Sequence, residues 1–147
     1  MSNRSETAVS RFKQGYNCAQ SVFSVFAEEL GLSRDQAMKV ANGFGGGMAR
    51  RGDTCGVLTG AMMAIGLARG SSEPDEAVKQ RVYAAIWDVL AEFRARQGAT
   101  LCRDLLQCDL ATEEGRKRAH ETGITKTLCP ELVATAVQIV EQNLKLN

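Results

Sequence analysis

Apolar residues recur every three or four positions along most of this chain, which is the spacing of one face of an α-helix. The longest such segment is expected to begin at a Ser72 cap, with Pro74 in its first turn, and to end before Gly98. Its apolar stripe consists of Val78, Val82, Ala85, Ile86, Val89, Leu90 and Phe93. No segment alternates apolar and polar residues as a half-buried strand would. The pattern predicts an all-α fold, a single compact bundle of about six to seven helices.

Capping residues mark the starts of the other helices. Asn17 can cap a helix over Cys18–Leu30, and Ser33 followed by Gln36 is a capping-box pattern. The remaining expected starts are Asp53 or Thr54 before Cys55–Ala68, Thr100 before Leu101–Gln107, Thr112 before a helix ending near Gly123, and Pro130 at the head of Pro130–Leu144. No repeat or linker divides the sequence, so residues 1–147 are expected to form one helical domain.

The charges are balanced, with 18 basic and 17 acidic residues and a formal net charge of +1. This balance argues against general binding to nucleic acid or to a membrane surface, both of which favour a basic excess. The longest apolar run, Cys55–Ala68, is shorter than the roughly 20 residues that cross a bilayer. The first residues lack an apolar signal segment. A cytoplasmic protein without a membrane span is therefore expected.

Four of the five cysteines lie at or within about one turn of an expected helix start. These four are Cys18, Cys55, Cys102 and Cys129, the last just before Pro130. The free N–H groups and positive dipole end of a helix stabilise a thiolate, so the pKa of each thiol is expected to fall. Cys108 follows Cys102 by six residues, about 240° round a continuous helix, and is expected to be a bystander.

A glycine-rich stretch, "NGFGGGMARRGD" over residues 42–53, precedes Cys55. Its N–H groups could cradle an anion with help from Arg50 or Arg51. A phosphate-binding loop is not expected, because no strand precedes the stretch and the loop lacks the required lysine. The favoured interpretation is close backbone approach to the Cys55 site, and the candidate cofactor-contacting glycines are Gly45, Gly46, Gly47 and Gly56. Gly56 and Gly60, with Ala64, also form a smooth helix face against which another helix can pack.

Taken together, "GYNCAQSVF", "GFGGGMARRGDTCGVLTGAMMAIGL", "CRDLL" and the "CP" before the last helix resemble the C_GCAxxG_C_C family of redox-active proteins. The resemblance covers residues 5 to 142, and Val57 stands where the family motif has alanine. It assigns the four family cysteines to Cys18, Cys55, Cys102 and Cys129 and leaves Cys108 without a counterpart. It implies a redox role but no settled substrate or cofactor.

The leading hypothesis is that the four family cysteines converge on one redox site. In one version the thiols cycle with disulfides, and a low-pKa Cys55 attacks while a neighbour resolves. In the other, four thiolates hold an iron–sulfur cluster. The redox partner would be a protein or a small-molecule thiol, a homodimer is conceivable, and whether the chain is an enzyme stays open.

Two further interpretations compete with a redox site. A structural four-cysteine zinc site is the first, although zinc ligands usually come in close pairs and the spacings here are 37, 47 and 27 residues. A helical interaction module with inert cysteines is the second. It predicts that Cys55→Ser and Cys102→Ser change packing alone.

Overall fold

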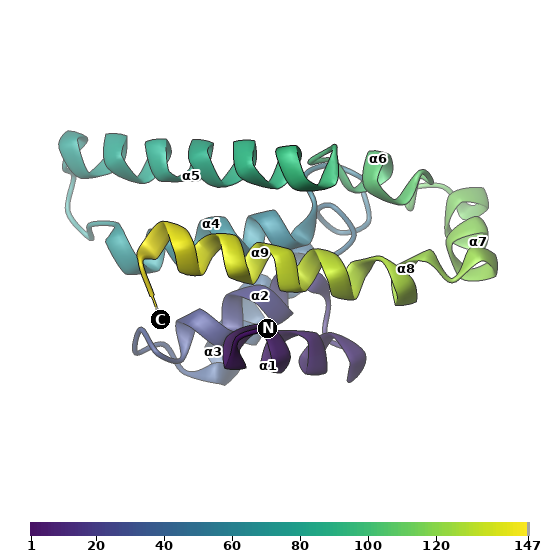
Figure 1. Ribbon diagram of the computed structural model, residues 1–147, viewed down its shortest axis with the longest axis horizontal. Helices are drawn as coiled ribbons and strands as arrows, with labels where there is room; N and C mark the ends of the chain where they lie inside the picture. Colours follow the sequence, from purple (N-terminus) through teal and green to yellow (C-terminus); the bar gives the residue numbers. More distant parts are fainter. Residues whose placement is uncertain (147) are drawn as a thin grey trace.

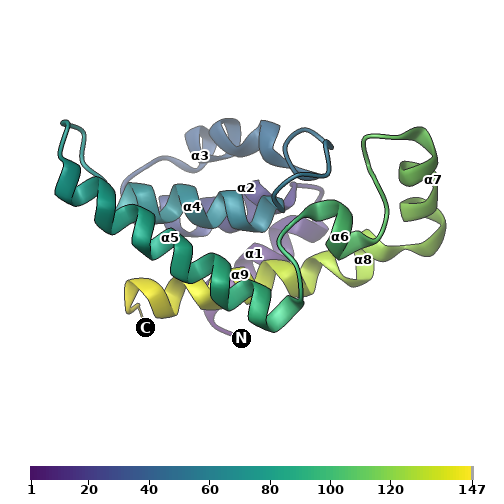
Figure 2. The ribbon, with the colours of Figure 1, turned by 90° about the horizontal axis from the view of Figure 1, so that it is seen from above.

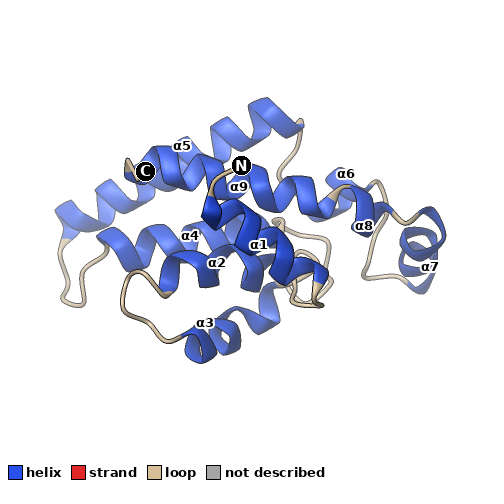
Figure 3. Ribbon diagram, turned by 60° about the horizontal axis from the view of Figure 1, so that its bottom comes forward, coloured by secondary structure: helices blue, strands red, loops and turns tan. Residues whose placement is uncertain are grey.

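The computed structural model describes residues 1–146 as helices joined by loops, and these residues form no strand (Figures 1 and 3). The predicted all-α fold is confirmed. The elements are α1 (Asn3–Lys13), α2 (Cys18–Ala27), α3 (Arg34–Ala41), the 3₁₀ turn η1 (Asn42–Phe44), α4 (Gly56–Arg69), α5 (Glu76–Gln97), α6 (Cys102–Leu106), α7 (Glu113–Thr122), α8 (Ile124–Thr127) and α9 (Cys129–Leu144). The four-residue α8 is an element that the hydrophobic pattern did not indicate.

Three expected helix caps lie one to three residues before the observed caps. Helix α5 begins at Glu76, because the Asp75 carboxylate, and not Ser72, accepts a hydrogen bond from the Val78 N–H at 3.0 Å. Pro74 therefore precedes the helix. The caps of α4 and α6 are Cys55 and Leu101, in place of Asp53 or Thr54 and of Thr100. In both cases the expected capping residues lie in extended segments that pair with each other, as described below.

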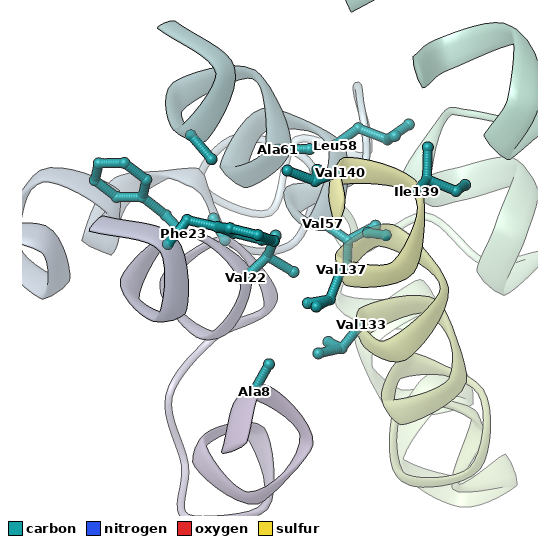
Figure 4. Packing of buried hydrophobic residues seen from close by; sticks show 14 of the residues in the cluster. Ala8, Val22, Phe23, Val57, Leu58, Ala61, Val133, Val137, Ile139 and Val140 are labelled. Atoms are coloured by element: carbon teal, nitrogen blue, oxygen red, sulfur yellow. The ribbon is translucent and has the colours of Figure 1, made fainter. Parts of the chain in front are cut away.

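The main core lies where α2, α4 and α9 meet (Figure 4). In Figure 1, α5 runs along one side, α4 and α9 lie beneath it, and α1 to α3 cover the opposite side. Phe26, Leu58 and Val137, one from each core helix, are fully buried. Each such side chain contributes about 1.5–3 kcal/mol on burial, so the crossing of these helices is a major source of stability.

Helices α2 and α4 approach each other closely because α4 presents glycine at the crossing, as the sequence predicts. A Cβ added to Gly60 would lie 2.8 Å from the Ala19 carbonyl oxygen, and one added to Gly56 would lie 2.5 Å from the Cys18 sulfur. Both distances are shorter than any side chain tolerates. The close crossing brings the first turn of α2 against the first turn of α4, with a cysteine in each.

Helices α6, α7 and α8 lie together at one end of the molecule (Figures 1 and 2). A second, smaller apolar cluster sits here, built on Cys102, Leu106, Cys108 and Ala119. Within residues 1–146 no helix has both the length and the apolar character needed to cross a membrane.

Candidate functional site

A cavity of about 230 Å³ lies between the first turns of α2 and α4 and the segment from α6 to α9. Its wall includes the sulfur-bearing residues Cys18, Cys55, Cys102 and Cys129. Most of the remaining wall is apolar, from α1, α6 and α9 and the loop after α6. The structure thus brings to one cavity the four cysteines that the sequence placed at a common site, and each of the five cysteines in the chain is a free thiol.

Each of these four cysteines stands at a helix N-terminus, as predicted. Cys18, Cys102 and Cys129 are the first residues of α2, α6 and α9, and Cys55 is the N-cap of α4. Helix α9 thus begins at Cys129, one residue before the expected start at Pro130. The cavity is therefore faced by four helix starts, each with backbone N–H groups that lack partners inside their own helix.

A short backbone pairing brings Cys55 and Cys102 to the same wall. The Cys55 N–H donates to the Thr100 carbonyl at 2.9 Å, and the Cys102 N–H donates to the Asp53 carbonyl at 2.7 Å. Thr54 and Leu101 form an isolated antiparallel bridge between these bonds. This pairing explains why neither Asp53 nor Thr100 caps a helix, since the backbone of both residues belongs to the bridge.

Asn17 connects the start of α2 to the glycine stretch. Its side chain accepts from the Gln20 N–H at 2.9 Å and donates to the Asn42 carbonyl at 2.8 Å. A Cβ on Gly45 would lie 2.7 Å from the Asn17 Cβ, so only glycine permits this approach. These contacts bring the backbone of Gly46 to the Cys18 thiol, where the Gly46 N–H donates to the sulfur.

The thiols of Cys18 and Cys55 share a hydrogen bond across the α2–α4 crossing. This bond, donated by the Cys55 thiol, lowers the pKa of Cys18 from an ordinary 9.0 to about 7. Burial opposes the shift, and the N–H groups of Gly46, Cys18 and Ala19 add to it. Cys18 is half-buried at the cavity wall, so it is the thiol that is both ionised near neutral pH and reachable.

The other three thiols do not follow the expectation of a lowered pKa. Cys55, expected to be the attacking thiolate, has its pKa raised well above 9.0 by its hydrogen bond to Cys18, by burial and by the Cys18 charge. Burial, followed by the charge of Cys18, raises the pKa of Cys102 and of Cys129 to about 12. A helix N-terminus stabilises a thiolate, but the hydrogen bond to Cys18 outweighs this effect at Cys55, and removal from water outweighs it at Cys102 and Cys129.

Cys108 is not turned away from the other cysteines. The premise of a continuous helix fails, because α6 ends at Leu106 and Gln107 adopts a left-handed conformation with φ 54°. This turn brings Cys108 into the same apolar cluster as Cys102, and Cys129 packs against that cluster. Cys108 is buried, at 9% exposure.

The candidate glycines have a structural reason to be glycine. Gly46 lines the cavity, and a Cβ on Gly47, where φ is +71°, would lie 2.7 Å from the Cys102 Cβ. Gly45 and Gly56 make the close approaches to Asn17 and Cys18 described above. Contact between these four glycines and a cofactor stays a prediction.

Metal ligation by one ion finds little geometric support. Among residues 1–146, no three side chains of the cysteine, histidine, aspartate or glutamate types gather closely enough to hold a common ion. The arrangement is better described as one hydrogen-bonded thiol pair, Cys18 with Cys55, and two protonated thiols on the same cavity.

Comparisons with known proteins agree with the motif. An uncharacterized protein of the archaeon Archaeoglobus fulgidus is 33% identical, over 88% of this chain and 85% of its own length. No solved structure matches the chain significantly. A family model described as "Putative redox-active protein (C_GCAxxG_C_C)" matches residues 16–143. This protein belongs to the C_GCAxxG_C_C family.

Proposed function

We propose that this protein is a dithiol–disulfide redox protein in which Cys18 and Cys55 are the reacting pair. One observation carries the proposal: the two thiols are hydrogen-bonded to each other at the wall of a cavity, and the reachable one is the acidic one. A thiolate is the form that attacks a disulfide, and a neighbouring thiol is needed to complete the exchange.

The exchange balances with these two residues and a substrate disulfide. The Cys18 thiolate attacks one substrate sulfur, the substrate S–S bond breaks, and the leaving thiolate takes a proton from solvent. Cys55 then attacks the Cys18 sulfur, which releases the second half of the substrate as a thiolate, and the proton that Cys55 loses passes to that thiolate. The substrate gains two electrons and two protons, and the protein is left with a Cys18–Cys55 disulfide.

Cys102 and Cys129 stay protonated at neutral pH and line the same cavity. We infer that these two thiols are a reserve. Either one can attack the Cys18 sulfur of the Cys18–Cys55 disulfide once hydroxide from solvent has removed its proton. Their raised pKa makes them slower than Cys18, because the thiolate is the nucleophile.

A second candidate, an iron–sulfur cluster, is favoured by the convergence of four thiols on one cavity. If a cluster is bound, Cys18, Cys55, Cys102 and Cys129 would hold it and it would supply one-electron transfer. The dithiol function is preferred, because Cys18 and Cys55 share a hydrogen bond and because no three ligand side chains among residues 1–146 gather closely enough to hold a common ion.

The experiment that separates these functions begins with purification without oxygen and without an affinity metal. Metal content and visible absorption are recorded, and free thiols are then counted before and after oxidation by glutathione disulfide. The expected result is a colourless, metal-free protein that loses one pair of thiols, mapped by mass spectrometry to Cys18 and Cys55. Cys18→Ser should abolish this loss, whereas the control Cys108→Ser should leave it intact.

Three outcomes would overturn the proposal. About four irons per chain or per pair of chains, with visible absorption, would establish the cluster. Stoichiometric zinc whose removal unfolds the chain would establish a structural site. Thiols that resist both oxidation and alkylation would leave a helical interaction module.

A further inference from the structure

Arg50 gives the cavity its charge. Among the described residues that line the cavity, Arg50 alone carries a formal charge at neutral pH, apart from the thiolate. Its side chain is exposed and makes no hydrogen bond or ion pair with residues 1–146. The neighbouring Arg51, by contrast, pairs with Asp53 at 3.2 Å. The guanidinium of Arg50 is thus available to a ligand that enters the cavity.

Arg50 stands at the cavity wall at the end of an unusual turn. Five consecutive residues, 46 to 50, have positive φ angles between 54° and 71°, and three of them, Met48, Ala49 and Arg50, are not glycine. Residues other than glycine rarely adopt this left-handed conformation. The turn closes with the Arg50 N–H donating to the Gly45 carbonyl at 3.0 Å.

This turn folds Arg50 back onto Gly46. A Cβ on Gly46 would lie 2.9 Å from both the Cα and the Cγ of Arg50, so the arginine stem rests on the glycine. The N–H of the same glycine donates to the Cys18 thiolate. One residue therefore connects the nucleophile to the base of the arginine side chain.

We propose that Arg50 is a specificity-determining residue that selects small disulfides carrying a carboxylate. The proposal rests on the function assigned above to Cys18. The apolar wall accommodates the hydrocarbon body of such a molecule, and a guanidinium binds a carboxylate through two parallel hydrogen bonds. The cavity, about 230 Å³, suits a small molecule, and its single fixed charge disfavours a cationic one.

The test compares two alkylating agents that differ in charge. Iodoacetate is anionic and iodoacetamide is neutral, and the Cys18 thiolate displaces iodide from both by the same reaction. Rates at Cys18 are measured by peptide mass spectrometry at low ionic strength. Arg50→Gln keeps the side-chain length and removes the charge, so the iodoacetate rate should fall about fivefold, the effect of one nearby charge at a partly solvated site. The iodoacetamide rate should change less than about twofold, because the hydrogen bonds that set the Cys18 pKa do not involve Arg50.

Arg51→Gln is the matched control, since it removes the same charge one residue away, and it should leave both rates unchanged. Arg50→Glu should lower the iodoacetate rate further. Two disulfides extend the comparison, anionic 5,5′-dithiobis(2-nitrobenzoate) and neutral 4,4′-dithiodipyridine. The Arg50 variants should again slow the anionic reagent more than the neutral one, and added salt should reduce the difference between the two rates. Thermal unfolding of each variant checks that the fold is retained.

The outcomes separate this proposal from the proposed function. Equal loss of both reagents' rates in Arg50→Gln, or an equal effect of Arg51→Gln, would overturn the selective role of Arg50 while leaving Cys18 as the nucleophile. A Cys18 that reacts with neither reagent near neutral pH would overturn the dithiol function and this role with it.

Discussion

The acidity of Cys18 depends on contacts made by three parts of the chain. Its own helix supplies the N–H groups of Cys18 and Ala19, the glycine stretch supplies the N–H of Gly46, and the segment before α4 supplies the Cys55 thiol. The Cys55 hydrogen bond is the largest contribution. A single thiol is thereby ionised near neutral pH, while its neighbours hold their protons.

The pH dependence of alkylation tests this assignment. Since the thiolate reacts, the iodoacetamide rate at Cys18 should rise with pH, with a midpoint near the pKa of about 7. Cys55→Ala removes the thiol donor and should move the midpoint upward, toward 9.0. The rate at pH 7 should then fall several-fold. Cys108→Ala serves as the control and should keep the wild-type midpoint. A midpoint unchanged in Cys55→Ala would contradict the hydrogen bond as the main cause.

At the scale of the element, two glycines of α4 have different roles where this helix crosses α2. Gly60 touches the backbone of α2 at Ala19, whereas Gly56 touches the Cys18 sulfur. The glycines at the two ends of the Cys-Gly-x-x-x-Gly motif thus set the separation of two helices and leave room for a thiol.

Alanine at each glycine should separate these effects. Gly60→Ala should lower the free energy of unfolding by about 1–3 kcal/mol, because its Cβ would lie 2.8 Å from the Ala19 oxygen. Gly56→Ala should destabilise by a similar amount and, in addition, displace the Cys18 sulfur, which lies 2.5 Å from the added Cβ. Urea unfolding measures stability, and the alkylation midpoint measures the thiol. Equal midpoints in the two variants would contradict a specific role for Gly56.

Local signals placed the helix starts at the cysteines to within one residue, because capping residues and Pro130 act within one turn, although the exact caps of α4 and α6 were wrong. The same signals failed at α5, where Ser72 and Asp75 are both good caps and only the fold selects Asp75. Which thiol is acidic could not be read from the sequence. The helix dipole is local, but the hydrogen bond between Cys18 and Cys55 and the donation by Gly46 come from contacts distant in the chain.

Arg50 was recognised from the sequence only as one of two arginines that could assist an anion. The partner of Arg51 and the left-handed turn that holds Arg50 at the cavity depend on the folded loop. Cys108 was misplaced for a comparable reason: the left-handed Gln107 ends α6 early, and glutamine gives no signal for that conformation.

At the scale of the whole molecule, the buried thiols make the free energy of unfolding depend on pH in the alkaline range. The folded-state pKa of Cys102 is about 12, above its ordinary 9.0. Between these values the folded chain keeps a proton that the unfolded chain releases, so the free energy of unfolding falls as pH rises, by up to about 1.4 kcal/mol per pH unit for one group. Below pH 9 the stabilisation is fully present.

Urea unfolding of wild type and Cys102→Ala at pH 8 and pH 10 measures the contribution of the Cys102 thiol to this pH dependence. The wild type should lose more stability between the two pH values than the variant, since the variant has no thiol to titrate at this position. Identical losses would show that residue 102 does not contribute to the alkaline transition.

The hydrogen bond between Cys18 and Cys55 joins two helices whose cysteines are 37 residues apart. Oxidation would convert that contact into a covalent crosslink, and closing a loop of this length is worth about 4 kcal/mol against the unfolded chain. By the thermodynamic cycle, the same energy makes the folded disulfide harder to reduce than the unfolded one, by roughly 80–90 mV for two electrons. The N–H groups that stabilise the Cys18 thiolate act in the opposite direction. The reduction potential of the proposed Cys18–Cys55 pair would therefore be a balance between this loop-closure energy, which favours the disulfide, and the N–H groups, that of Gly46 among them, which favour the thiolate.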